Sequence, residues 1–265
     1  MGSTDDLLRQ VRNACAEQLP AKALQVRILD LLRPHVGYDG HVFPLTDPVT
    51  LVSAAPHADV PMLPWERLPE LIRWRYLSTV NRVDALTGRP AASLRLSDAG
   101  PTASPAWVHV LQEIGVHDTA NVVFADRYGT WGYLELLRTG HRFEQSELDV
   151  LTALAATATA SRRPVVARTF VDPGEQLVPV GPAVVLLGAD LDVEQQTEAA
   201  AAALLQLLPP DELRAPIPAA AYNVGAALIA AESGVPLGEP WSRVHLGGGR
   251  WVTVKASRLG AGIAI

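Results

Sequence analysis

Residues that could form a catalytic centre are few and scattered in this sequence. The motifs of a nucleophile elbow, GxSxG, and of a phosphate-binding loop, GxxxxGK[S/T], are absent, as are HExxH and CxxC. Asp190 and Asp192 flank an expected turn, where solvated carboxylates are favoured over a catalytic pair. Gly247-Gly248-Gly249 opens no helix and precedes no lysine, so a hairpin turn is favoured over a phosphate site. We therefore expect no enzymatic activity.

Metal and haem ligands are also weakly indicated by the seven histidines. His109, His117 and Asp118 are close in sequence, but a metal site needs ligands that converge in a fixed geometry, so a polar loop is favoured. Haem ligation by a single histidine is an alternative for three residues, namely His41, His57 and His109. We expect neither a metal nor a cofactor.

The overall composition limits the partners of this chain. Its single cysteine, Cys15, excludes an internal disulfide and fits a reducing, cytoplasmic compartment. Cys15 falls on the apolar stripe of an expected helix, which favours a buried, unreactive thiol over a redox sensor. A net charge of −6 is not the basic footprint that nucleic acids require. Neither a signal peptide nor a membrane span of roughly 18 apolar residues is present.

Aromatic side chains in the first half of the sequence are its most distinctive chemical feature. They are Trp65, Trp74, Tyr76, Trp107, Trp131 and Tyr133. Ligand pockets are mostly apolar and aromatic, with a few polar groups that fix orientation. A small-molecule pocket and a filled core are equally good interpretations of this set. Arg75 and Arg82 could pair with an anionic ligand, although solvation at the surface is favoured.

Hydrophobic periodicity predicts the elements that position these aromatics. Helices are expected at residues 5–18, 21–32, 65–80, from 105, and at 144–160, and strands at 41–45, 50–54, 122–125 and 130–138. A tight turn at 126–129 joins the last two strands into a hairpin. Alternation along 130–138 puts Trp131, Tyr133 and Glu135 on one face. Arg162-Arg163-Pro164 ends the last of these helices.

The order of these elements and the residues of the hairpin resemble a GAF domain. The most specific stretch runs from Gly115 through strand 122–125 to Trp131-Gly132-Tyr133-Leu134-Glu135-Leu136, followed by Phe143 and a helix near Glu147. The resemblance implies an α+β fold with an antiparallel sheet flanked by helices. It also implies a pocket over one sheet face, with helix 65–80 and the segment around Trp107 as its lid.

The resemblance further implies a floor for that pocket, formed by His41, Phe43, Trp131, Tyr133 and Glu135. The full set of candidate ligand-binding residues is therefore His41, Phe43, Trp65, Trp74, Tyr76, Trp107, Trp131, Tyr133 and Glu135.

A smaller second domain is expected after a Pro- and Gly-rich linker. Strands at 183–187 and up to Val193, helices at 194–208 and 217–232, and a hairpin at 243–246 and 250–256 resemble a degenerate, PAS-like α/β domain. The expected division is 1–163, linker 164–181, and 182–265. The strand beginning at Gly262 stops mid-pattern, which would leave a bare sheet edge, so we expect the native chain to continue.

The combination resembles the sensory region of actinobacterial LuxR-type transcriptional regulators, in which GAF-like and PAS-like parts precede a helix-turn-helix. No helix-turn-helix is present in this chain, so DNA contact is expected only through a missing C-terminal domain. The predicted function is sensing of an unidentified small molecule through a conformational shift. The alternatives are a ligand-free scaffold for dimerisation or protein interaction, and an enzyme of an unrecognised class. The resemblance also implies a homodimer through helices 5–18 and 144–160.

Overall fold

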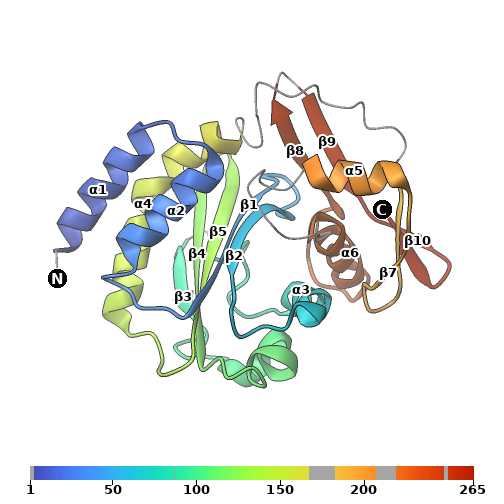
Figure 1. The fold of residues 1–265 in the computed structure, drawn as a ribbon. Helices are drawn as coiled ribbons and strands as arrows, with labels where there is room; N and C mark the ends of the chain where they lie inside the picture. The colour runs from blue at the N-terminus through green and yellow to red at the C-terminus, as the bar shows by residue number, and fades with distance from the viewer. Residues whose placement is uncertain (1–2, 87, 167–182, 207–218, 248–249) are drawn as a thin grey trace.

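The first half of the protein is built on a five-stranded antiparallel sheet. The computed structural model describes residues 3–86, 88–166, 183–206, 219–247 and 250–265. The strand order is β2-β1-β5-β4-β3 (Figure 1). The strands are β1 (Gly40–Thr46), β2 (Ser53–Asp59), β3 (Ala91–Ser93), β4 (Asp118–Asp126) and β5 (Gly129–Arg138). The expected α+β class, with a helix-flanked antiparallel sheet, is confirmed.

Three helices cover one face of this sheet, and an apolar core lies between them and the strands. They are α1 (Thr4–Ala16), α2 (Ala21–Leu32) and α4 (Gln145–Val166), on the left in Figure 1. Leu7 and Val11 on α1, at helical spacing, are fully buried in one cluster with Phe43 and Leu134 of the strands. The buried small side chains of α4 include Ala158 and allow α1 to pack closely against it.

The opposite face of the sheet is covered by shorter helical segments. They are η1 (Trp65–Arg67), α3 (Leu68–Leu77), η2 (Pro101–Ala103) and the π-helix η3 (Trp107–Leu111). Leu71, Val110 and Leu111 are buried there against Val42 and Leu137 of the sheet.

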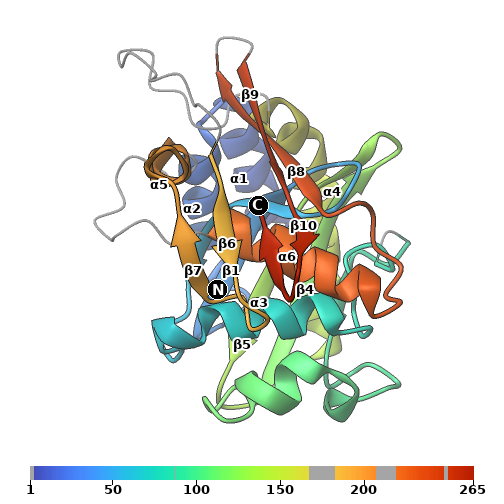
Figure 2. The same cartoon turned by 90° about the vertical axis from the view of Figure 1, so that its right-hand side faces the viewer.

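The C-terminal part of the chain from residue 183 onward, called the second half below, forms its own small sheet and packs against α3. Its sheet has the order β10-β11-β6-β7. The elements are β6 (Val185–Leu187), β7 (Val193–Gln196), α5 (Glu198–Gln206), α6 (Ala219–Glu232), β8 (Trp241–Gly247), β9 (Arg250–Lys255), β10 (Ser257–Leu259) and β11 (Gly262–Ala264). Helix α6 lies between α3 and this sheet (Figures 1 and 2). Ile72 of α3 shares a core cluster with Val224 and Ala227 of α6.

Several element boundaries differ from the sequence expectations for local reasons. Strand β2 starts at Ser53 because the Asp47 carboxylate accepts hydrogen bonds from the amides of Val49 and Thr50, which holds 47–50 as a turn. Residues 194–196, expected to be helical, belong to β7. The Thr197 hydroxyl accepts from the Ala200 amide and so caps the start of α5.

The other differences concern the ends of helices and of the second sheet. Helix α3 ends at Leu77, and α4 continues through Pro164 to Val166, although the proline supplies no amide donor to the preceding turn. Strand β11 pairs with β10 on one side and β6 on the other, so it is not the bare edge expected from the sequence. Linker residues 167–181, Gly248-Gly249, 207–208 and 217–218 lie outside the described residues. The domain division and the PAS-like interpretation stay predictions.

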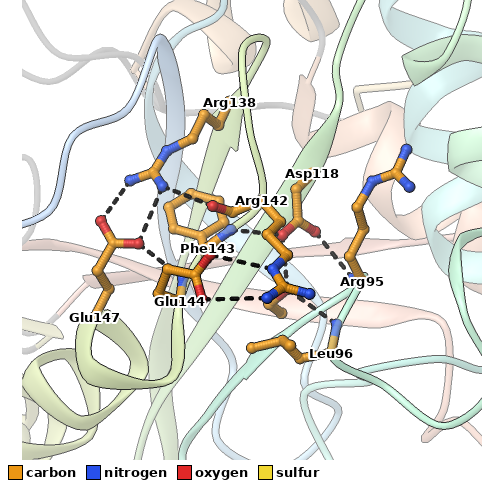
Figure 3. A network of polar contacts seen from close by, with 9 residues as sticks. Arg95, Leu96, Asp118, Arg138, Arg142, Phe143, Glu144 and Glu147 are labelled. Atoms are coloured by element: carbon orange, nitrogen blue, oxygen red, sulfur yellow. Dashed lines mark hydrogen bonds and ion pairs between the residues drawn. The ribbon is translucent and has the colours of Figure 1, made fainter.

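Buried charges anchor the hairpin to the start of α4. Asp118 is completely buried, and its carboxylate accepts from the Ser93 hydroxyl at 2.7 Å and from the Thr119 amide at 2.8 Å. It also accepts from the amides of Arg95 at 3.0 Å and Phe143 at 2.9 Å (Figure 3). Nearby, buried Arg138 forms an ion pair with Glu147 of α4 at 2.8 Å. No described helix is long and apolar enough to cross a membrane.

We expect Asp118→Asn to lower the free energy of unfolding by about 2–4 kcal/mol, because the amide nitrogen would face amide donors in a buried site. Urea denaturation followed by circular dichroism measures this loss. The exposed Asp98→Asn is the matched control and should change stability by less than about 0.5 kcal/mol. Equal effects of the two substitutions would show that the hydrogen bonds of Asp118 do not hold the hairpin.

Candidate functional site

A cavity of about 120 Å³ lies between α3 and the sheet, on the face away from α1, α2 and α4. Its floor consists of side chains from β2, β4 and β5, and its walls come from the end of α3, the following loop and the segment before η3. The lining is Leu51, Ser53, Arg75, Tyr76, Ser78, Val80, Asn81, Arg82, Val83, Asp84, Leu94, Ser104, Ala106, Leu111, Thr119, Asn121, Tyr133, Glu135 and Leu237.

Strand alternation explains which sheet residues reach the cavity. Glu135 of β5 lies directly opposite Asn121 of β4, so the two side chains share a face. Tyr133 and Thr119 are each two residues away on the same strands and therefore point to the same side. The intervening Leu134 and Leu136 belong to the dry core on the other side.

An ion pair is buried beside the cavity. Arg75 of α3 pairs with Glu135, of which only 6% is exposed. Burial raises the pKa of Glu135, and the guanidinium of Arg75 counteracts part of that rise. Among the described residues, Arg75 Nε has no hydrogen-bond partner, and the same holds for Asn81 Nδ2 on the next loop. Unsatisfied buried donors are rare, so their presence on two residues that line one cavity is notable.

Two tyrosines add hydroxyl groups to the same wall. Tyr76 Oη accepts a hydrogen bond from the Ser53 amide at 3.1 Å, and Tyr133 Oη lies 3.2 Å from Ser53 Oγ. Burial raises the pKa of both tyrosines above the ordinary value. Both hydroxyls are therefore protonated at neutral pH, and Tyr76, which accepts from Ser53, keeps its own proton for a further acceptor.

The second half of the chain closes one side of the cavity. Leu237 is part of the lining, and Arg82 donates from Nη2 to the Pro236 carbonyl at 2.8 Å. Arg82 also pairs with Asp84 at 2.9 Å. The sequence favours solvation of Arg75 and Arg82 at the surface, whereas the structure places both in ion pairs at the cavity.

Of the candidate residues, the structure brings Tyr76, Tyr133 and Glu135 together at the cavity. His41 and Phe43 lie on the other face of the sheet, which corrects their expected place on the floor. The reason is register, since Val42 stands opposite Glu135, and His41 stands opposite Leu136.

The four tryptophan candidates lie outside the cavity lining. Trp107 donates from Nε1 to the Val116 carbonyl at 3.1 Å, and Trp74 stacks on His109 with ring centroids 4.1 Å apart. Trp131 is the unpaired residue of a β-bulge, with the guanidinium carbon of Arg163 5.8 Å from its ring centroid, while Trp65 is 42% exposed. These positions correct their expected roles as lid or floor.

Sequence reasoning missed the polar residues Ser53, Asn81, Thr119 and Asn121. Thr119 and Asn121 alternate with the apolar residues Ala120 and Val122, a pattern typical of a strand. They were not assigned to the sheet because the expected strand began at Val122, whereas β4 starts four residues earlier, at Asp118. Nothing in the sequence indicates Leu237.

Comparisons with known proteins found similarity to solved structures only. No protein-family model matches the sequence, and neither does any curated protein. Among solved structures, the chain is similar to an N-acylhomoserine lactone dependent LuxR family transcription factor from Burkholderia cenocepacia, with 19% identity and a TM-score of 0.46. That match covers 62% of this chain and 98% of the other.

Two further similar structures contain GAF domains. One is the phycocyanobilin-bound GAF domain of a cyanobacterial phytochrome, with 13% identity, a TM-score of 0.43, and coverage of 62% of this chain and 98% of that one. The other is a GAF domain/HD domain protein from Geobacter sulfurreducens, with 16% identity, a TM-score of 0.33, and coverage of 61% and 99%. These likenesses concern the order of helices and strands alone.

Among the described residues, no three His, Cys, Asp or Glu side chains lie close enough together to hold a metal ion.

His41 is buried near His57, with ring centroids 5.1 Å apart. Burial, and then the proximity of His57, lower the pKa of His41 from 6.5 to about 4. The folded chain therefore holds this imidazole neutral over a range in which the unfolded chain protonates it.

We expect His41→Phe to flatten the acid side of the stability profile. Because the pKa of His41 is lower in the folded chain, only the unfolded chain binds a proton at this residue as the pH falls from 6.5 toward 4. The free energy of unfolding is therefore unaffected by His41 above pH 6.5 and decreases across that window. The wild type should lose about 3 kcal/mol more than the variant across that window. Urea denaturation at several pH values measures the difference. The exposed His141→Phe should follow the wild type, and a parallel profile for His41→Phe would refute the assignment.

Proposed function

We propose that this chain is a small-molecule-sensing module and that the ligand occupies the cavity beside α3. The observation that supports this most directly is the pair of buried, unpartnered donors, Arg75 Nε and Asn81 Nδ2, on residues that line one cavity. A ligand acceptor would satisfy donors that otherwise cost roughly 1–3 kcal/mol each. Ligand sites are commonly concave and apolar with a few such convergent polar groups.

The charges around the cavity indicate the class of ligand. Arg75 and Glu135 neutralise each other, as do Arg82 and Asp84, and both tyrosines are protonated. The remaining lining combines apolar side chains with uncharged polar ones; the apolar residues are Leu51, Val80, Val83, Leu94, Ala106, Leu111 and Leu237, and the polar residues are Ser53, Ser78, Asn81, Ser104, Thr119 and Asn121. The ligand would therefore be an uncharged molecule with a small apolar body and at least one hydrogen-bond acceptor.

The position of α3 supplies a route for the signal. Its Arg75 and Tyr76 line the cavity, while Ile72 packs in the core shared with α6. Arg73 also reaches across to Asp190 of the second half, with a nitrogen-to-oxygen distance of 2.7 Å. A ligand that favours one position of α3 would shift the population of arrangements of the second half.

The output proposed for this shift is transcription, through a DNA-binding domain joined to the module, in a homodimer and in the cytoplasm. This part rests on the sequence resemblance to LuxR-type regulators. The apolar stripes of α1 and α4 are buried within one chain, so a dimer would use their other faces. The homodimer stays a prediction.

The proposal includes the absence of enzymatic activity. The cavity lining contains neither histidine nor cysteine, and its Ser53 hydroxyl contacts a protonated tyrosine in place of a base. The main rival is the ligand-free scaffold, which the tryptophans favour because they pack in the core or at the surface outside the cavity.

We expect the full chain, purified from its own host, to carry a small molecule visible by native mass spectrometry. Ala106→Trp fills the cavity and should remove that added mass, because Ala106 is buried in the lining. Thr102→Trp is the matched control, since Thr102 is exposed on the same segment outside the lining. It should keep the added mass.

Two results would favour the scaffold over the sensor. One is an added mass that Ala106→Trp retains at wild-type occupancy. The other is an empty wild-type spectrum together with no rise in melting temperature across a library of uncharged, acceptor-bearing compounds, since ligand binding must stabilise the folded state.

A further inference from the structure

Two histidines lie side by side at the edge of the large sheet, on the face away from the cavity. His41 belongs to β1, and His57 belongs to β2, the edge strand of that sheet. The register pairs His41 with Asp59 and Phe43 with His57, so these four side chains share one face. The two imidazole ring centroids are 5.1 Å apart, and the ring planes are inclined by 49°. The rings are therefore close neighbours that are not stacked in parallel.

Neither ring nitrogen of His41 has a partner. The residue is only 5% exposed, and among the described residues its Nδ1 and Nε2 make no hydrogen bond. A neutral imidazole carries one donor and one acceptor nitrogen, and buried polar atoms of this kind nearly always have a partner. The absence of a hydrogen bond extends to the adjacent ring of His57. An acceptor nitrogen of His41 is thus left unsatisfied next to a second imidazole.

The spacing of the two rings matches that of two imidazoles bound to one metal ion. Zinc bonds an imidazole nitrogen at about 2.0–2.1 Å in a tetrahedral arrangement. Because that nitrogen lies about 1.1 Å from the centre of its ring, two such ligands on one ion have ring centroids about 5 Å apart. The centroids of His41 and His57 are separated by 5.1 Å. Strands β1 and β2 therefore hold the two rings at the spacing that a shared ion requires.

The protonation state and the charges around the pair also suit a cation. Metal ions bind neutral imidazole, and burial together with His57 lowers the pKa of His41 to about 4, so the ring is neutral at ordinary pH. The negative charge of Asp59 acts on His41 more strongly than the opposing positive charge of Arg33. The guanidinium carbon of Arg33 lies 4.2 Å from the ring centroid of Tyr38. Half-buried His57 leaves a path for an ion from solvent.

We propose that His41 and His57 together bind one divalent transition-metal ion. Imidazole nitrogen is a good ligand for zinc, copper and nickel, whereas magnesium and calcium take oxygen ligands. Because no group of three His, Cys, Asp or Glu side chains is found among the described residues, the other positions on the ion are filled by water or by a ligand from outside the chain. The ion links β1 to the edge strand β2 and stabilises the folded chain.

This site is independent of the proposed sensing function. It lies on the opposite face of the sheet from the cavity and shares no residue with the cavity lining. From the sequence alone neither a metal nor a cofactor is expected, because the two histidines belong to different strands and meet only through the register of β1 and β2. Failure of the metal site would therefore leave the cavity proposal untouched.

The test titrates the tag-free full chain with zinc chloride, with native mass spectrometry for the stoichiometry and a competing chromophoric chelator for the dissociation constant. We expect one zinc ion per chain. His41→Phe and His57→Ala should each weaken zinc binding by roughly tenfold or more, since even the outer partners of metal ligands are worth that much. The exposed His141→Phe is the matched control and should bind zinc as the wild type does. Zinc should raise the melting temperature of the wild type and of this control only.

Several results would overturn the proposal. One is a wild type that takes up no zinc at roughly 1 mM, which is already a weak affinity. Another is wild-type zinc affinity in either variant, once circular dichroism shows that it is folded. Should both variants fail to fold, the wild type decides the matter, because bound zinc should protect His57 from modification by diethyl pyrocarbonate. Equal modification of His57 with and without zinc would contradict the site.

Discussion

The burial of α3 on both of its sides is the constraint on which the rest of the structure depends. Leu71 packs toward the large sheet, and Ile72, the next residue, packs toward α6. A helix that is apolar around most of its circumference must be enclosed. The same helix therefore forms the wall of the cavity and the contact between the two halves. Any change in the cavity that moves α3 acts directly on the second half.

The large sheet separates two regions with different chemistry. On one side, α1, α2 and α4 form an apolar core in which Arg162 is the unusual buried charge. On the other side, the side chains of alternate residues line a cavity of mixed polar and apolar character that contains the Arg75–Glu135 pair. Charges that serve structure are fully satisfied, as Asp118 shows with its set of amide and hydroxyl donors. Among the described residues, buried donors without a hydrogen-bond partner occur on Arg75 and Asn81 at the cavity, on Arg162 in the apolar core, and also on His41, Arg73 and Trp131.

Much of the local structure could be predicted from the sequence, and most of the boundary errors have local causes. Helix 21–32 and the hairpin around Gly129 follow from apolar periodicity and turn chemistry. Strand β2 starts three residues later than the alternation of residues predicts, because the Asp47 side chain holds residues 47–50 in a turn. The candidate site was recovered in part, since Tyr133 and Glu135 share a strand and therefore a face.

The sequence did not allow us to predict which strands and helices far apart in the chain contact one another. Whether His41 or Val42 faces the cavity depends on the register between β1 and β5, and a shift of one residue exchanges the two faces. The contacts of Arg75 with Glu135, of Leu237 with the cavity, and of Arg162 with Phe43 likewise depend on packing between elements far apart in the chain. The sequence by itself determined the elements and the aromatic and charged residues available to them. Only the tertiary structure decided which of these residues meet, because register and helix packing are set by the whole core and not by local periodicity.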